Sequence, residues 1–115
     1  MAELDALREQ VREFVRERDW DQFHSPKNLA MALSVEAAEL LEIFQWLTED
    51  ESRHPQPKAL AAARDEIADV FIYLLRISEK LGVDPVAEAK RKLALNAAKY
   101  PVDKARGNAR KYDEL

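Results

Sequence analysis

Two pairs of acidic residues near the middle of the 115-residue chain have the spacing of a shared chemical site. Glu36 and Glu39 lie three residues apart, and Glu66 and Asp69 repeat that spacing. Residues three apart on an α-helix lie on one face, so two antiparallel helices could bring all four carboxylates together. Oxygen donors of this kind are the ligands that Mg²⁺ and Mn²⁺ prefer. The spacing is therefore compatible with a divalent metal site formed by these four acids, and Glu36 is the main reason to consider one.

Glu36 is the most unusual of the four, because it falls inside an apolar stripe. At helical spacing, this stripe consists of Leu29, Leu33, Leu40, Phe44 and Leu47. A lone carboxylate in such a seam is costly unless it is neutralised, paired or bound to a metal. Glu39 lies at the edge of the stripe, whereas Glu42 points to the opposite face and is expected at the surface.

The same acids could also serve in ion pairs or in a di-iron centre. Glu66 and Asp69 could form ion pairs with nearby Arg64 or Arg76, and spacing alone leaves this alternative open. A di-iron bundle also uses carboxylates from several helices, but it needs Glu-x-x-His on two of them. The one match in this chain, Glu51 to His54, lies in a proline-flanked segment, and His24 precedes a helix start. The sequence therefore disfavours a di-iron centre.

Helical periodicity and sparse helix breakers predict four helices in a single domain over residues 1–115. The first runs from Leu4 to about Arg18. The second starts at Ser25-Pro26, a cap followed by proline, and runs to about Leu47. The third spans 58–81 and ends at Gly82, and the fourth starts at Asp84-Pro85 and ends before Pro101. No window alternates like a strand, so the expected fold is an all-α four-helix bundle.

The third predicted helix is apolar on more than one side. Its main stripe consists of Leu60, Ile67, Val70, Phe71 and Leu74, and Ile72 and Leu75 extend the apolar surface. One small bundle cannot easily cover every face of such a helix. The pattern favours a central position or an interface in a homo-oligomer.

Composition narrows the class of protein. The chain is 47% hydrophobic and 35% charged, and it holds no cysteine, which excludes a disulfide scaffold and thiolate metal sites. It has no apolar run of the ~20 residues that span a bilayer, and its start is acidic, so we expect a cytoplasmic protein without a membrane partner. The net charge of −4 argues against nucleic-acid binding. Acids gather over residues 34–53 and bases over 86–111; they could meet two parts of one ligand or be solvated faces.

The segment Arg18–Leu29, with Trp20, Phe23 and His24, resembles the opening signature of the MazG-like nucleoside triphosphate pyrophosphohydrolases, and most closely their dCTP pyrophosphatase-like subfamily. The two acidic pairs match the E-x-x-E…E-x-x-D magnesium motif of that superfamily. Further matching segments are Phe44-Gln45-Trp46, residues 96–102 and residues 111–115. The resemblance covers nearly the whole chain, and the combination of motifs is far more specific than either acidic pair alone.

The resemblance implies a site for a metal and a nucleotide. It gives coordination of Mg²⁺, with Mn²⁺ as a substitute, to Glu36, Glu39, Glu66 and Asp69. It gives contacts with base and sugar to Trp20, Phe23, His24, Trp46 and Tyr73. It places Asn28, Lys92, Asn96, Lys99 and Tyr100 near sugar or phosphates. It also implies dimers or tetramers in which one subunit helps to build its neighbour's pocket.

The predicted reaction is Mg²⁺-dependent hydrolysis of a nucleoside triphosphate, dCTP or a modified pyrimidine deoxynucleotide, to the monophosphate and pyrophosphate. Such an enzyme would serve nucleotide-pool housecleaning. Of the two candidate catalytic acids, we favour Glu39 over Glu36 as general base, because the edge of the stripe is nearer solvent. The alternatives are a broad-specificity nucleotide pyrophosphatase and a non-catalytic oligomeric helical module, which gives no reason for Glu36 in a seam.

Overall fold

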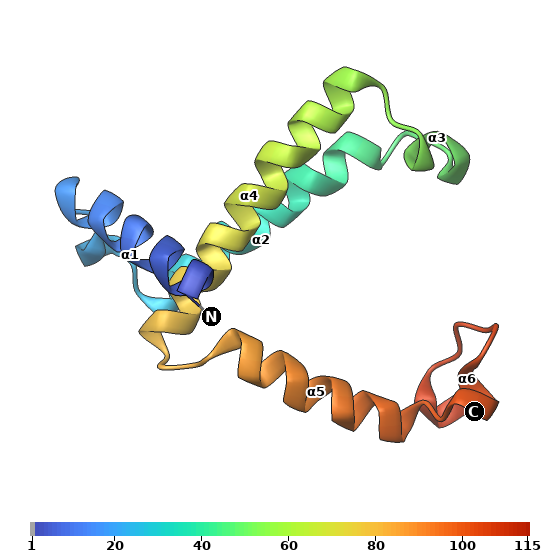
Figure 1. Cartoon of the computed structure of the whole chain (residues 1–115). Helices are drawn as coiled ribbons and strands as arrows, with labels where there is room; N and C mark the ends of the chain where they lie inside the picture. Colours follow the sequence, from blue (N-terminus) through green and yellow to red (C-terminus); the bar gives the residue numbers. More distant parts are fainter. Residues whose placement is uncertain (1) are drawn as a thin grey trace. The chain divides into compact units, whose positions relative to one another are not determined.

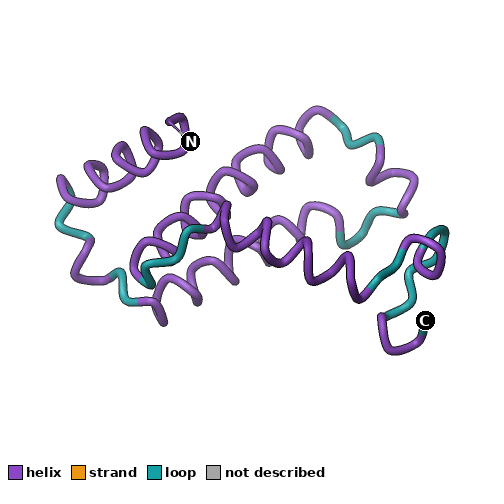
Figure 2. Tube along the Cα trace, turned by 60° about the horizontal axis from the view of Figure 1, so that its bottom comes forward, coloured by secondary structure: helices purple, strands orange, loops and turns teal. Residues whose placement is uncertain are grey.

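The computed structural model describes residues 2–115, which form helices and loops and no strand (Figure 2). The order of the α-helices is α1 (Ala2–Glu17), α2 (Pro26–Phe44), α3 (Glu49–Arg53), α4 (Pro57–Lys80), α5 (Pro85–Lys99) and α6 (Val102–Ala105). Two short 3₁₀ helices are η1 (Asp21–Phe23) and η2 (Tyr112–Glu114). The predicted all-α class is confirmed, but the predicted count of four helices is wrong because α3 and α6 are additional.

The local signals for the four long helices are confirmed at their ends. The Ser25 side chain accepts a hydrogen bond from the Asn28 amide, 3.1 Å away, and Pro26 is the first residue of α2. The Asp84 side chain caps α5 in the same way. Gly82 follows α4 with a φ of +66°, the left-handed conformation that glycine adopts without strain.

The additional helix α3 also has a signal in the sequence. Thr48 and Glu51 form a capping box, in which each side chain accepts a hydrogen bond from the backbone amide of the other residue. Because this cap starts a new helix, α2 ends at Phe44 rather than at the predicted Leu47.

The described residues fall into two compact units, 2–82 and 83–115. In the first unit, α2 and α4 lie side by side and antiparallel, and α1 packs on α4 (Figure 1). The second unit holds α5, α6 and η2, and Tyr100 and Tyr112 meet edge to face with their ring centroids 6.2 Å apart. The single domain over 1–115 and the packing of the fourth long helix into one bundle stay predictions.

The α2–α4 pair is built on one stripe of small and apolar residues from each helix. On α4, positions three and four apart are buried or half-buried: Ala59, Ala63, Glu66, Val70, Tyr73 and Ile77. On α2 the facing stripe is Leu29, Leu33, Glu36, Leu40 and Phe44. Glu36 and Glu66 thus occupy seam positions that packing alone would give to apolar residues.

Within residues 2–82, α4 contacts both α2 and α1, and the predicted interface in a homo-oligomer stays a prediction. Four residues of its predicted main stripe, Leu60, Ile67, Phe71 and Leu74, remain 40–57% exposed. The reason is geometric: α2 covers the side of α4 that carries Ala63 and Val70, and α1 covers part of its C-terminal half, where Leu75 is buried. Within residues 2–82, an apolar face of α4 is therefore left uncovered by α1 and α2.

Candidate metal and nucleotide site

Three glutamates converge in the seam between α2 and α4. One carboxylate oxygen each of Glu36, Glu39 and Glu66 lies within 4.8 Å of the other two, and all three residues are half-buried. The Oε2 atoms of Glu36 and Glu66 are buried without a hydrogen-bond partner among residues 2–115. Nor does any lysine or arginine of that part of the chain form an ion pair with the three acids. No lysine or arginine side chain within residues 2–115 therefore balances the charge of these three acids.

The crowding of like charges alters the acidity of Glu36. Its pKa is raised to about 7, first because its carboxyl can share a proton with Glu66, then because of burial and the nearby Glu39. Three converging carboxylates, with two buried oxygens left unbonded, are a suitable donor set for a hard divalent cation. The residues present fit Mg²⁺ or Mn²⁺.

A cavity of about 490 Å³ adjoins this cluster. Its wall includes five of the predicted site residues: Trp20, His24, Glu36, Asp69 and Tyr73. These residues come from the segment after α1, from α2 and from α4, so the fold of residues 2–82 brings together side chains far apart in sequence. Asp69 faces this cavity with Glu36, but it is not among the three acids whose oxygens lie within 4.8 Å.

Other predicted residues lie away from the cavity. Phe23 is 58% exposed and Trp46 is 88% exposed. The Asn28 side chain donates a 2.9 Å hydrogen bond to the Phe23 carbonyl and so holds the turn before α2. The remaining four, Lys92, Asn96, Lys99 and Tyr100, belong to the second unit. The roles of all seven residues in substrate binding stay predictions from the family resemblance.

Phe14 and Arg76 are among the cavity residues that were not assigned to the site from the sequence. Phe14 meets the ring of Trp20 edge to face at 5.7 Å, and the Arg18 guanidinium lies 3.8 Å from the Phe14 centroid. Arg76 lies three residues after Tyr73 and seven after Asp69, a spacing that places it on the same side of α4. That spacing is the signal that could have identified it.

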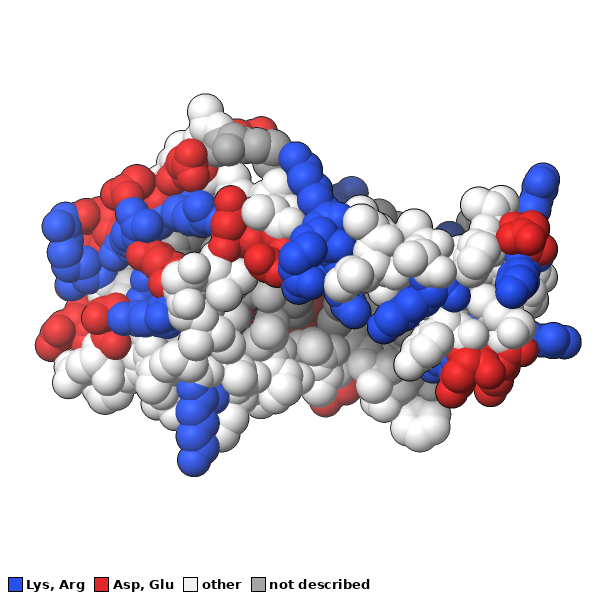
Figure 3. Space-filling view, turned by 90° about the horizontal axis from the view of Figure 1, so that it is seen from below, with Lys and Arg blue, Asp and Glu red and all other residues white. Residues whose placement is uncertain are grey.

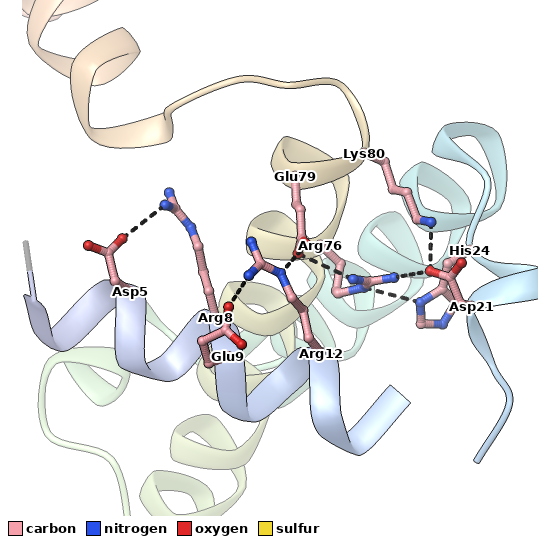
Figure 4. Close-up of polar contacts among 9 residues, drawn as sticks. All are labelled: Asp5, Arg8, Glu9, Arg12, Asp21, His24, Arg76, Glu79 and Lys80. Atoms are coloured by element: carbon pink, nitrogen blue, oxygen red, sulfur yellow. Dashed lines mark hydrogen bonds and ion pairs between the residues drawn. The ribbon is translucent and has the colours of Figure 1, made fainter. Parts of the chain in front are cut away.

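Arg76 is the centre of a second charged group (Figure 4), and only 4% of its surface is exposed. Its Nη2 donates to Asp21 at 2.9 Å, its Nη1 to Glu79 at 3.2 Å, and its Nε to His24 Nδ1 at 3.3 Å. These contacts replace the pairing of Arg76 with Glu66 or Asp69 that the sequence left open. Arg64 likewise forms no ion pair with either acid within residues 2–115.

Each carboxylate of this Arg76 group has a second cation. Lys80 donates to Asp21 at 2.6 Å, and Arg12 of α1 bonds to Glu79. Hydrogen bonds from Lys80 and then from Arg76 lower the pKa of Asp21. On α1, Arg12 and Arg16 likewise pair with acids one turn away. Figure 3 shows that basic and acidic side chains lie next to one another on the surface of the molecule.

Known proteins are similar to nearly the whole of this chain. A model of the MazG-like family matches residues 31–115, which include both acidic pairs. The chain belongs to the MazG-like family. It is 43% identical to dCTP pyrophosphatase 1 of Homo sapiens over 115 residues, which cover 97% of this chain and 67% of the human protein. The Rattus norvegicus protein of that name is 42% identical over 114 residues, with the same coverage.

A solved structure supports the same family. The crystal structure of a pyrophosphatase from Archaeoglobus fulgidus DSM 4304 is similar with a TM-score of 0.82 and 42% sequence identity, covering 86% of this chain and 93% of the archaeal one. The family resemblance inferred from the sequence motifs of this MazG-like protein is therefore confirmed. No helix within residues 2–115 combines the length and the apolar character needed to cross a membrane.

Proposed function

We propose that this protein hydrolyses dCTP, or a modified pyrimidine deoxynucleoside triphosphate, to the monophosphate and pyrophosphate, and so clears unwanted nucleotides from the cytoplasmic pool. The enzyme class is confirmed by relatives named dCTP pyrophosphatase 1 and by a structural neighbour named a pyrophosphatase. The observation that carries the proposal is the convergence of Glu36, Glu39 and Glu66, which form no ion pair within residues 2–115, beside a cavity with aromatic walls.

The proposed cofactor is Mg²⁺, or Mn²⁺ in its place, held by Glu36, Glu39 and Glu66, with Asp69 as the fourth acid. The buried, unbonded oxygens of Glu36 and Glu66 support this assignment, because an uncompensated carboxylate in a seam otherwise destabilises the fold. A bound divalent ion supplies positive charge to phosphate oxygens and favours the deprotonation of water.

The residues of the chain then have distinct roles in the proposed site. Trp20 and Tyr73 offer flat faces to a base, where stacking contributes about 1–3 kcal/mol per base. Glu39 accepts the proton of the attacking water as this water bonds to the α phosphorus and pyrophosphate leaves. Attack at that phosphorus follows from the family resemblance, and the choice of Glu39 rests on its place at the edge of the apolar stripe.

We also propose that the enzyme is a homo-oligomer, a dimer or a tetramer. The support is the exposed apolar face of α4, made by Leu60, Ile67, Phe71 and Leu74. The exposed ring of Trp46 would then contact substrate in the assembled form. Light scattering at micromolar concentration should give a mass of at least two chains, and an active monomer would contradict the proposal.

The direct test is pyrophosphate release from a panel of ribo- and deoxynucleoside triphosphates, with Mg²⁺, with Mn²⁺ and with a chelator. We expect dCTP and its modified forms to react fastest, and only when a divalent ion is present. Similar rates for all bases would favour the broad-specificity alternative. Absence of pyrophosphate release from a folded, metal-loaded protein would contradict the proposal and favour a non-catalytic module.

A further inference from the structure

The contact between Arg76 and His24 fixes which nitrogen of the imidazole carries the proton. Arg76 Nε lies 3.3 Å from His24 Nδ1, as Figure 4 shows. A guanidinium can donate a hydrogen bond but cannot accept one. His24 Nδ1 must therefore be the acceptor and carry no proton, and the proton of the neutral ring lies on Nε2.

The surroundings of His24 favour the neutral ring. Burial is the largest cause that lowers its pKa, and the charge of Arg76 is the next; Lys80 adds to the shift and Asp21 opposes it. The other titratable groups that share its cavity wall are Glu36, Asp69 and Tyr73. A protonated ring would also turn an Nδ1–H toward the Nε–H of Arg76, and two donors cannot bond to each other.

The second ring nitrogen is available to a ligand. Nε2 has no hydrogen-bond partner within the part of the chain that the structure describes, and the His24 side chain lines the 490 Å³ cavity. We propose that Arg76 is a positioning residue that holds His24 as a neutral Nε2–H donor to an acceptor atom of the bound nucleoside. This inference rests on the proposed function. It adds Arg76 as a residue that, through His24, makes the site prefer nucleosides with a hydrogen-bond acceptor opposite Nε2.

When Arg76 is substituted, each of its two acidic partners keeps another cationic partner. Asp21 keeps Lys80, and Glu79 keeps Arg12. Arg76→Met preserves the length and the apolar stem of the side chain, so the substitution removes the donor and the charge and leaves the packing largely in place. This variant separates the effect on His24 from loss of the fold.

The first experiment is nitrogen NMR of the ¹⁵N-labelled full chain without nucleotide. In the parent we expect a protonated Nε2, an unprotonated Nδ1 and a His24 pKa below its ordinary value. Arg76→Met should raise this pKa, because the positive neighbour is lost while Asp21 stays. The matched control is Arg12→Met, which breaks a contact with Glu79 but not with His24, and should leave the His24 signals unchanged. A proton on Nδ1 in the parent would overturn the inference.

The second experiment is a kinetic cycle with dCTP as the substrate. Arg76→Met should raise KM about tenfold and change kcat little, as expected for loss of one hydrogen bond to the bound nucleotide. In a His24→Gln background, whose amide replaces the Nε2–H donor, the same change should alter KM by less than about twofold. A lower melting temperature with unchanged KM and unchanged His24 pKa would overturn the inference.

These outcomes are separate from those of the proposed function. The NMR measurement needs no activity, so it tests the protonation of His24 even if no nucleotide is hydrolysed. Conversely, an active parent enzyme in which Arg76→Met leaves both His24 and KM unchanged would retain the proposed function and remove Arg76 from it.

Discussion

Two groups of carboxylates in residues 2–82 differ in the cations around them. Asp21 and Glu79 each bond to two cations, from Arg76, Lys80 and Arg12. Glu36, Glu39 and Glu66 have none within the described chain, although they lie closer to the apolar seam. Both groups look alike in the sequence, as acids on or near helices. Their difference in structure indicates that the first group ties α1, η1 and α4 together and that the second is a donor set that could hold a divalent cation.

One carboxyl of each group, Asp21 and Glu36, has a shifted pKa, and the two shifts have opposite directions. Neighbouring cations lower the pKa of Asp21, whereas the pKa of Glu36 is raised to about 7 by proton sharing with Glu66, burial and Glu39. Cations favour the ionised form of a carboxyl, and crowding with like charge disfavours it. A divalent ion bound to the cluster would favour the ionised form of Glu36 and so lower its pKa.

The largest expected effect is on catalysis. Glu36→Gln and Glu66→Gln should each lower kcat/KM in saturating Mg²⁺ by more than about a hundredfold, because loss of several kcal/mol of charge stabilisation corresponds to more than two decades. Glu42→Gln, on the exposed side of the same helix, is the matched control and should behave as the parent. Steady-state pyrophosphate release measures all three. Full turnover by Glu36→Gln would contradict a role of Glu36 in metal binding, and with it the proposed difference between the two groups.

The sequence predicted the seam position of Glu36 because helical periodicity is local, and it predicted the caps at Ser25 and Asp84 for the same reason. It could not determine which side of α4 meets α2, because that helix has more apolar residues than one chain covers. Nor could it choose the partner of Arg76: a long side chain reaches several acids, and the choice of Asp21 depends on tertiary packing.

A smaller effect is expected on the stability of the metal-free protein. Glu36→Gln should match or exceed the parent in melting temperature, by up to a few degrees, because it removes an uncompensated charge from the seam. Asp21→Asn should melt at or below the parent, because it weakens two ion pairs. Calorimetry in a chelator provides both values. A Glu36→Gln protein that melts well below the parent would indicate that the three glutamates stabilise the fold rather than bind a metal.

The smallest expected effect is on how stability depends on pH, again without metal. Glu36 has an ordinary pKa of 4.5 and a folded value of about 7, so the folded state binds its proton more tightly. The stabilisation from Glu36 is therefore fully present below about pH 4.5, and it is lost as the pH rises through about 7. For Asp21, whose folded pKa lies below 3.8, the contribution is present above that value and is lost only in stronger acid.

Between about pH 5 and about pH 8, the contribution of Glu36 to the free energy of unfolding should consequently fall, whereas that of Asp21 should stay constant. His24 acts with the opposite sign to Glu36 in this range, because its lowered pKa makes folding more favourable as the pH rises. The contribution of Glu36 is thus isolated as the difference between the parent and Glu36→Gln in denaturant unfolding at the two pH values. We expect the variant to lose less stability than the parent on going to the higher pH, whereas Asp21→Asn should follow the parent. If parent and Glu36→Gln show the same pH dependence, Glu36 ionises as freely in the folded chain as in the unfolded one, and the seam does not crowd its charge.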